Sequence, residues 1–182
     1  LPDVIDIEWI NDKTIAFLAH NGCLSEIGAF KTSGGEPNLE KFADNVVYTS
    51  LSLSADHQFA AATGHSTEHP FEVFVSPEPG PGGTPIRITD VNPWLEKKRF
   101  AKQEVVSYES RDGKTIEGVL IRPLDEEPGK KYPLLLFVHG GPESHVSNGW
   151  VSFYSYPGQT AAAKGYAVFH PNYRGSTGRG VA

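Results

Sequence analysis

Residues 134 to 145 read LLLFVHGGPESH, and this stretch decides the fold prediction for the second half of the chain. Its first five residues, LLLFV, form an apolar run without polar alternation, which is typical of a parallel strand covered on both faces. The run ends in four residues of a different kind: His139, Gly140, Gly141 and Pro142. We therefore expect a strand whose carboxyl end opens into a loop, at the edge where open α/β sheets bind ligands.

The two glycines suit this loop to oxyanion binding. A tetrahedral intermediate requires unpaired main-chain N–H groups aimed at the developing charge, and glycine lets a substrate carbonyl approach closely. Pro142 sets the direction of the chain and favours extended geometry at Gly141. The alternative is that Gly-Gly-Pro only turns the chain and that His139 is a hydrogen-bonded structural side chain. From these four residues alone the two interpretations carry equal weight.

The sequence on both sides of this stretch predicts an α/β domain. Downstream, GQTAAAK (158 to 164) predicts a short helix that Gly165 ends, and YAVFHPN (166 to 172) predicts a second apolar strand. Strand, helix and strand at this spacing form a parallel crossover, which is almost always right-handed. Upstream, VVSYESRDGKTIEGVLIRP (105 to 123) predicts a hairpin whose turn is Asp112-Gly113. We assign residues 104–182 to this domain and residues 93–103 to a connector.

Residues 1–92 carry a loose internal repeat. One pair of similar segments is WINDKTIAFLAHNG (9 to 22) and LSADHQFAAATGHS (53 to 66). A second pair of similar segments is GGEPNL (34 to 39) and GGTPIRI (82 to 88). A period of about 44 to 48 residues, with short alternating runs, is typical of a four-stranded propeller blade. The predicted strands are 5–10, 14–19, 24–31, 46–53, 58–63, 71–76 and 85–89. Because two blades cannot close a ring, we expect further blades upstream.

Composition excludes several partner classes. The chain has 182 residues, a net charge of −6 and no methionine, and it begins with Leu1, so we expect a fragment. With no basic run and no long apolar segment, we expect neither nucleic acid nor a membrane as a partner. The single cysteine, Cys23, is interpreted as a strand residue and not as a nucleophile. The compartment stays open, with the cytoplasm favoured over the periplasm.

Two further motifs are interpreted as loops. HSTEH (65 to 69) fits the H-x-x-E-H spacing of some zinc hydrolases, but that chemistry requires a helix, and Gly64 and Pro70 favour a loop. RGSTGRG (174 to 180) lacks both the P-loop lysine and the G-x-G-x-x-G order, so we interpret it as the turn after the second strand. We expect no metal and no cofactor.

HGGP after an apolar strand, followed by QTAAAKGYAVFHPNYRGSTGRG, resembles the prolyl oligopeptidase family of serine peptidases, most closely its acylaminoacyl-peptidase and dipeptidyl-peptidase branches. The resemblance implies last propeller blades followed by the start of an α/β-hydrolase domain that hydrolyses short peptides by acyl transfer. It also implies that the main-chain N–H of Gly141, aided by Gly140, is one oxyanion donor. His139 and Pro142 would shape the site, and Tyr173 and Arg174 would line its rim. The alternative for Arg174 is that it holds its turn by hydrogen bonds.

The nucleophile is missing from this sequence. Neither GHSTE (64 to 68) nor RGSTG (174 to 178) matches the G-x-S-x-G elbow, and the order Ser, Asp or Glu, His places the whole triad after Ala182. The resemblance therefore implies a chain that is inactive alone, whose LLLFV strand presents an apolar edge to the rest of the domain or to another chain. Two alternatives stay open: a non-catalytic propeller-type binding module, and an esterase or lipase.

Overall fold

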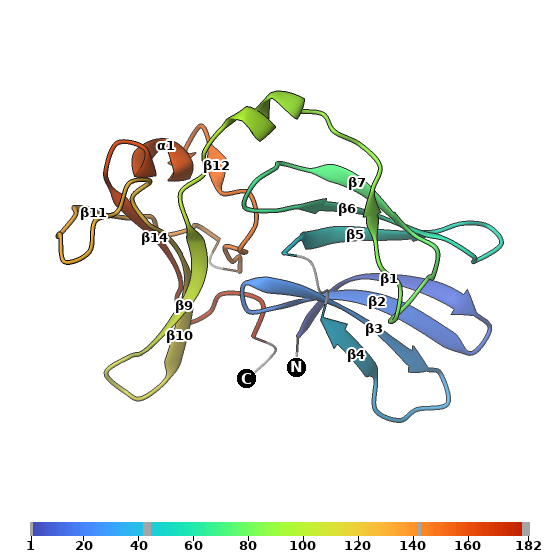
Figure 1. Ribbon diagram of the computed structural model, residues 1–182. Helices are drawn as coiled ribbons and strands as arrows, with labels where there is room; N and C mark the ends of the chain where they lie inside the picture. The colour runs from blue at the N-terminus through green and yellow to red at the C-terminus, as the bar shows by residue number, and fades with distance from the viewer. Residues whose placement is uncertain (1, 42–44, 142, 180–182) are drawn as a thin grey trace.

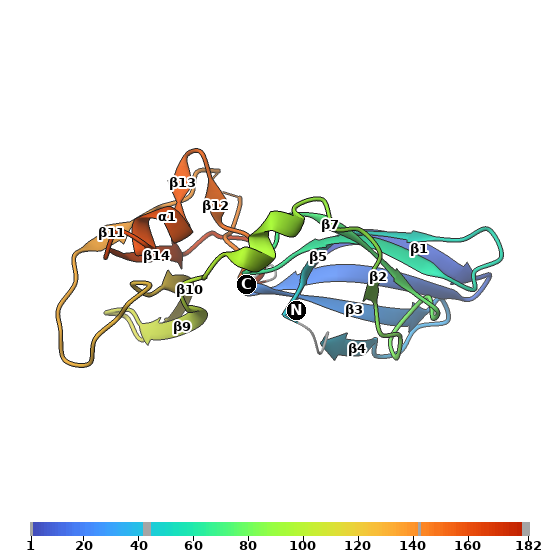
Figure 2. The ribbon, with the colours of Figure 1, turned by 45° about the horizontal axis from the view of Figure 1, so that its top comes forward.

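A computed structural model describes residues 2–41, 45–141 and 143–179. The described residues form three four-stranded sheets and one small two-stranded sheet. Figures 1 and 2 show two of the four-stranded sheets packed together on one side of the molecule, and the third sheet with a short helix on the other side. No helix among the described residues is long and apolar enough to cross a membrane.

The first two sheets are antiparallel meanders in which each strand pairs with the next one along the chain. The first sheet contains β1 (Asp3–Asn11), β2 (Thr14–Asn21), β3 (Leu24–Lys31) and β4 (Asn38–Lys41). The second sheet contains β5 (Val47–Leu53), β6 (Ala60–His65), β7 (Glu72–Ser76) and β8 (Ile86–Arg87). All seven strands predicted for this half are present, and β4 was missed.

The internal repeat in the sequence corresponds to the two four-stranded meanders. Asp12 lies in the β1–β2 turn and Asp56 in the β5–β6 turn, while Ala16 and Ala60 are buried in the second strand of their sheets. GGEPNL leads into β4 as GGTPIRI leads into β8. The repeat therefore contained the signal for β4, which its polar sequence NLEK conceals.

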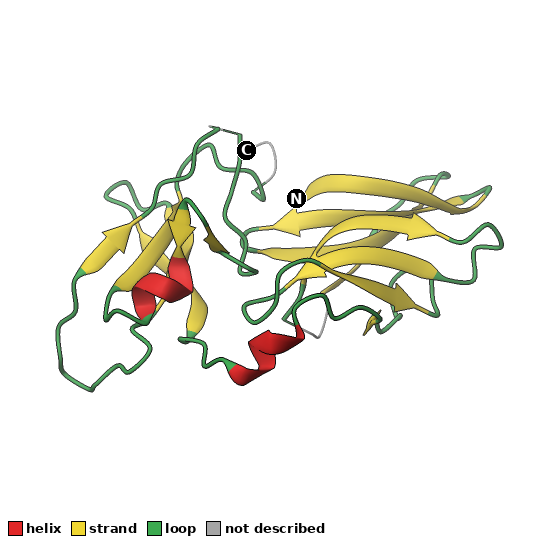
Figure 3. Cartoon of the chain, turned by 90° about the horizontal axis from the view of Figure 1, so that it is seen from above, coloured by secondary structure: helices red, strands yellow, loops and turns green. Residues whose placement is uncertain are grey.

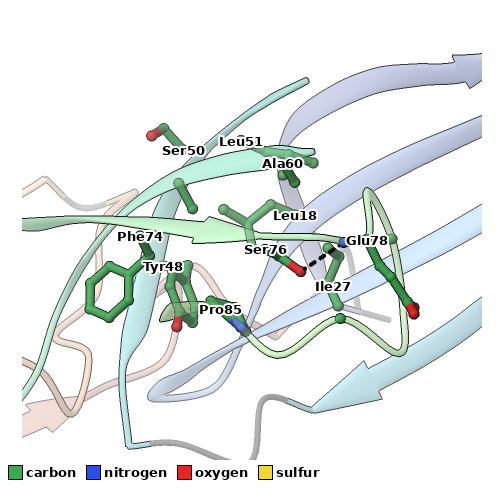
Figure 4. Close-up of a pocket in the computed structure, with 13 residues that line it drawn as sticks. Leu18, Ile27, Tyr48, Ser50, Leu51, Ala60, Phe74, Ser76, Glu78 and Pro85 are labelled. Atoms are coloured by element: carbon green, nitrogen blue, oxygen red, sulfur yellow. Dashed lines mark hydrogen bonds between the residues drawn. The ribbon is translucent and has the colours of Figure 1, made fainter. Parts of the chain in front are cut away.

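The two meanders share one hydrophobic core. The buried residues that form it are Ala16, Leu18, Ile27, Tyr48, Leu51, Ala60 and Phe74. Figure 4 shows Leu18 and Ile27 of the first sheet near Leu51 and Tyr48 of the second, around a cavity of about 20 Å³. A hydrogen bond ties the sheets together, because the Tyr48 amide donates to Ser25 Oγ over 2.9 Å. The meanders therefore form one packed unit.

The third sheet, called the mixed sheet below, has the order β11-β14-β10-β9. Its strands are β9 (Gln103–Glu109), β10 (Thr115–Ile121), β11 (Leu134–Leu136) and β14 (Ala167–Asn172). β9 and β10 form the predicted hairpin, β10 pairs antiparallel with β14, and β11 pairs parallel with β14. The predicted helix, α1 (Gly158–Ala162), lies between β11 and β14 in sequence, and Gly165 follows it with a φ of +83°.

Three short elements complete the fold. A 3-10 helix, η1 (Pro93–Lys97), lies in the predicted connector between the meanders and the mixed sheet (Figure 3). β12 (Ser152–Phe153) and β13 (Tyr156–Pro157) pair with each other beside α1. The mixed-sheet core consists of Ala101, Ile121, Val151, Ala161, Ala162 and Val168.

Two predictions about this fold were wrong. The LLLFV strand is not covered on both faces, because Leu134 is 58% exposed and Leu136 is 59% exposed. In the described chain β11 is an edge strand, and α1 and its neighbours cover only the face that carries Leu135 and Phe137. Cys23 is not a strand residue either, since it lies in the β2–β3 turn, where it is buried.

Candidate functional site

The loop that follows β11 places the glycine pair beside a cleft of about 270 Å³. Gly140 is among the lining residues and Gly141 is not. The other lining residues come from the end of β6, the start of the loop after β11, the 144–151 segment, β12, β13 and β14: His65, His139, Ser144, His145, Val146, Ser147, Trp150, Val151, Phe153, Tyr156 and His170. The cleft thus lies between the second meander and the carboxyl ends of β11 and β14, where the sequence placed the ligand site.

The amides of Gly140 and Gly141 donate no hydrogen bond to any residue that the structure describes. The last main-chain hydrogen bond that continues the parallel pairing is earlier, from the Phe137 amide to the Phe169 carbonyl over 2.9 Å. The strand pairing therefore ends before the glycines. Two consecutive amides without a protein partner next to a cleft are the arrangement that binding of an oxyanion requires.

Gly141 adopts a backbone conformation that only glycine tolerates without strain. Its φ is +146°, and a Cβ at this position would lie 2.8 Å from the Glu143 amide nitrogen. At Gly140, by contrast, a Cβ would meet nothing within 4 Å among the described atoms. Pro142, the fourth residue of the motif, lies outside the described residues.

The buried His139 side chain holds the glycine loop in place through two hydrogen-bond contacts. It is 5% exposed, and its Nε2 lies 2.8 Å from Ser176 Oγ. Its Nδ1 lies 3.0 Å from the Gly140 carbonyl oxygen, which can only accept, so Nδ1 carries the proton and Nε2 accepts from the serine hydroxyl. His139 is thus a buried, hydrogen-bonded side chain that also contacts the peptide group that follows it.

Tyr173 also contacts this loop, through its ring and through its hydroxyl. Its ring stacks on the imidazole of His139 with centroids 4.5 Å apart, and its hydroxyl donates to the His139 carbonyl oxygen over 2.8 Å. The turn after β14 and the loop after β11 are therefore joined at both the side chain and the main chain of His139. The sequence did not indicate that Ser176 takes part in this arrangement.

Arg174 points to the hairpin turn of the mixed sheet. Its Nη1 lies 2.6 Å from Asp112 Oδ2, and both side chains are largely exposed. The pKa of Asp112 is lowered, first by the hydrogen bond from the Ser110 hydroxyl and then by the positive charge of Arg174. Tyr173 and Arg174 also line a cleft of about 570 Å³ with Glu143 and Ser176, so Arg174 both holds a turn and borders an opening.

In the described part of the chain, one hydrogen bond joins the side chains of a serine and a histidine, and it is the bond between Ser176 and His139. Both residues are buried, and the second nitrogen of the imidazole faces a carbonyl and not a carboxylate. A general base of this type normally has a carboxylate at that position, which stabilises the imidazolium that forms. The pair therefore has the geometry of a structural contact.

The HSTEH motif and Cys23 lie in surroundings that do not suit catalysis or metal binding. Residues 66–69 form a turn in which Ser66 Oγ accepts from the amides of Glu68 and His69, so His65 and His69 do not share a helix face. No group of three metal-ligating side chains that could hold an ion is found among the described residues. Burial raises the pKa of the Cys23 thiol to about 12, and the Asn172 side-chain amide lies 3.3 Å from its sulfur.

Comparison with known proteins shows that the sequence of this chain is similar to those of peptidases. The uncharacterized peptidase YuxL of Bacillus subtilis is 36% identical over 132 residues, which are 72% of this chain and 19% of that protein. Human dipeptidyl peptidase 8 is 40% identical over 83 residues, 45% of this chain and 9% of that protein. The chain is a relative of these peptidases. This relationship confirms the resemblance to the prolyl oligopeptidase family, although no family model matches the chain.

The fold agrees with that relationship. A solved acylaminoacyl peptidase, in complex with Z-Gly-Gly-Phe-chloromethyl ketone, superposes with a TM-score of 0.71 at 21% sequence identity. The match covers 97% of this chain and 26% of that protein, and the Pyrococcus horikoshii acylaminoacyl peptidase gives the same values. This chain therefore spans about a fifth or less of the length of the first curated peptidase relatives it matches.

Proposed function

We propose that this chain supplies the oxyanion loop of a serine peptidase that hydrolyses short peptides by acyl transfer. In this proposal residues 1–92 are two blades of a β-propeller, 93–103 are the connector, and 104–182 begin an α/β-hydrolase domain. The peptidases among the relatives and the order of the four strands in the mixed sheet support this assignment.

One observation carries the proposal. The amides of Gly140 and Gly141 have no partner among the described residues, and Gly140 borders the cleft at the end of a parallel strand. An oxyanion held by these N–H groups would be stabilised without reorganisation, since His139 and Tyr173 hold the loop before the charge develops. The attacking hydroxyl and its base would come from a G-x-S-x-G elbow and from Asp and His residues that follow it in sequence.

The exposed edge of the mixed sheet fits the same proposal. Leu134, Leu136 and Val138 are all more than half exposed and lie on or directly after β11, which has a neighbour on one side only in the described chain. A strand that continues the sheet next to β11 would cover this edge and would end beside the glycine loop. That is the place where a nucleophile elbow could direct its hydroxyl toward a carbonyl held by Gly140 or Gly141.

A matched pair of variants tests the oxyanion assignment in the full-length protein. Gly140→Ala keeps the amide hydrogen and has room for its Cβ, whereas Gly140→Pro removes the donor. If Gly140 is a donor, kcat for an acylaminoacyl or aminoacyl chromogenic peptide falls about 100- to 1000-fold in the proline variant only. Equal kcat in both variants would leave the Gly141 amide as the donor of this loop, and full activity in Gly141→Pro as well, which removes that N–H, would reject the proposal.

The 182-residue chain alone gives a second test. With oxyanion donors but no nucleophile, it should hydrolyse none of these peptides above the rate of the buffer. Turnover by the purified chain that is unaffected by substitution of Gly141 would reject the assignment. The gene sequence after the codon for Ala182 separates the enzyme from a binding module, because only the enzyme requires G-x-S-x-G followed by Asp and His.

A further inference from the structure

Three histidines from separate segments meet where the two meanders adjoin the mixed sheet. His20 lies near the end of β2, His65 is the last residue of β6, and His145 belongs to the loop after β11. The rings of His20 and His145 are in edge contact with centroids 4.3 Å apart, and Nε2 of His20 is buried without a partner in the described structure. Imidazoles packed in this way are stable together only while most of them are neutral.

His65 makes the most specific of these contacts. The main-chain N–H of Trp150 donates to His65 Nδ1 over 2.7 Å, across a sequence separation of 85 residues. Because an N–H can only donate, Nδ1 must present its lone pair and His65 must be neutral. Protonation of His65 would place a hydrogen on Nδ1 that faces the amide hydrogen of Trp150, so the contact would change from attraction to repulsion.

The site is shaped around the His65 ring. A Cβ on Gly149 would lie 2.3 Å from His65 Nδ1, so the ring reaches the Trp150 amide only because residue 149 is glycine. On its other side the ring packs against Phe71 with centroids 4.5 Å apart. His65 is 6% exposed, so its hydrogen bond to the Trp150 amide is largely shielded from water.

The groups around the cluster oppose protonation. Burial lowers the pKa of His65 and of His145 to about 4, and it lowers the pKa of His20. The charged or titratable groups that act on these three rings, besides the rings themselves, are His69, His139 and Asp3. Asp3 is the one carboxylate of this set, and its Oδ2 already accepts a hydrogen bond from the Gly178 amide.

We propose that the His65–Trp150 contact is an acid-released latch between the second meander and the loop that walls the cleft beside Gly140. Its release would move the end of β6 away from the 144–151 loop. Since His65 itself lines the cleft, this movement would widen it. The inference concerns access to the cleft, and it stands or fails independently of whether the glycine amides bind an oxyanion.

The direction of the pH dependence follows from proton linkage. In the closed form the pKa of His65 is about 4, below the ordinary 6.5, so the closed form binds fewer protons than the open form. The closed form is therefore fully favoured above pH 6.5 and loses stability as the pH falls from 6.5 to 4. Titration of His65 alone shifts the closed-to-open ratio about 20-fold between pH 7 and pH 5.

Distance measurement between spin labels tests the latch. Glu68→Cys in the turn after β6 and Tyr154→Cys between β12 and β13 provide exposed attachment points on the two sides of the contact, while Cys23 is buried. In the full-length protein we expect one distance at pH 7.5 and an added longer distance at pH 5, with unchanged far-UV circular dichroism. Identical distance distributions at the two pH values would overturn the proposal.

Three variants carry the same labels. His65→Asn keeps an acceptor near the position of Nδ1 but cannot be protonated, so it should stay closed at pH 5. His57→Asn, in the exposed turn at the other end of β6, should open with acid as the unsubstituted protein does. An acid-opened His65→Asn would overturn the assignment to His65. Should His65→Asn fail to fold, Gly149→Ala decides, since it must populate the long distance already at pH 7.5, and a closed Gly149→Ala would refute the latch.

Discussion

His139 Nε2 lies 2.8 Å from Ser176 Oγ, and this buried hydrogen bond joins the loop after β11 to the turn after β14. The carbonyl of His139 meets the same turn through the hydroxyl of Tyr173. The glycine amides therefore do not rely on their own flexible backbone for position. Their orientation depends on the side chains of Tyr173 and Ser176, which come from the turn after β14.

Removal of the imidazole should release the glycine loop. For His139→Ala in the full-length protein we expect kcat to fall about 100-fold or more, because the glycine amides that we propose as oxyanion donors would lose their fixed direction, with a smaller change in KM. Tyr173→Phe keeps the stacking and loses one hydrogen bond, so a fall of about 5- to 10-fold is expected. Steady-state kinetics on a peptide substrate measures both, and an unchanged kcat in His139→Ala would show that the loop needs no such fastening.

The two glycines should differ in their tolerance to alanine. Gly141→Ala combines a φ of +146° with a contact of 2.8 Å to the Glu143 amide, so we expect a loss of about 1–3 kcal/mol in the free energy of unfolding. Gly140→Ala is the matched control and should change this free energy by less than about 0.5 kcal/mol. Denaturant unfolding of both variants checks the difference, and equal stabilities would contradict the backbone geometry described for Gly141.

The exposed edge strand should make the isolated chain self-associate. Leu134 and Leu136 present apolar side chains beside unpaired main-chain groups of β11, which favours pairing with another copy. We expect light scattering of the 182-residue chain to increase with concentration, and the double variant Leu134→Lys and Leu136→Lys to reduce it. A monodisperse monomer at all concentrations would argue against an edge that requires cover.

Cys23 should be unreactive in the native protein. Its pKa is raised to about 12, first by burial and then by the negative charge of Glu117, so very little thiolate exists at pH 8. Mass spectrometry after treatment with iodoacetamide should show almost no alkylation of the folded chain and complete alkylation in denaturant. Rapid alkylation of the folded chain would place Cys23 in an open environment.

His170 should make the protein less stable in acid. It is fully buried, both ring nitrogens lack a partner among the described residues, and burial lowers its pKa to about 4. Because its pKa is lower in the folded than in the unfolded chain, stability is retained above pH 6.5 and falls between 6.5 and 4. For His170→Leu, which removes an unpaired polar group, we expect a gain of about 1–3 kcal/mol that is larger at pH 5 than at pH 7.5. Thermal melts at both pH values check this, and an equal or lower stability of the variant at pH 5 would contradict it.

The elements that depend on local sequence were predictable. The internal repeat predicted two similar sheets, Asp112-Gly113 predicted the hairpin turn, and GQTAAAK predicted α1. These signals lie within a few residues of the structure that they specify. β4 and the β12–β13 pair were missed because their sequences are short and carry little apolar alternation.

The sequence by itself determined where the longer strands and the hairpin turn lie and that a glycine pair follows a parallel strand. Only the tertiary structure decided which side chains hold that pair, because His139 and Ser176 are 37 residues apart and meet through the pairing of β11 with β14. The contact of His65 with Trp150 spans 85 residues and joins the end of β6 to the 144–151 loop. Such contacts follow from packing between elements, which no periodicity within one element contains.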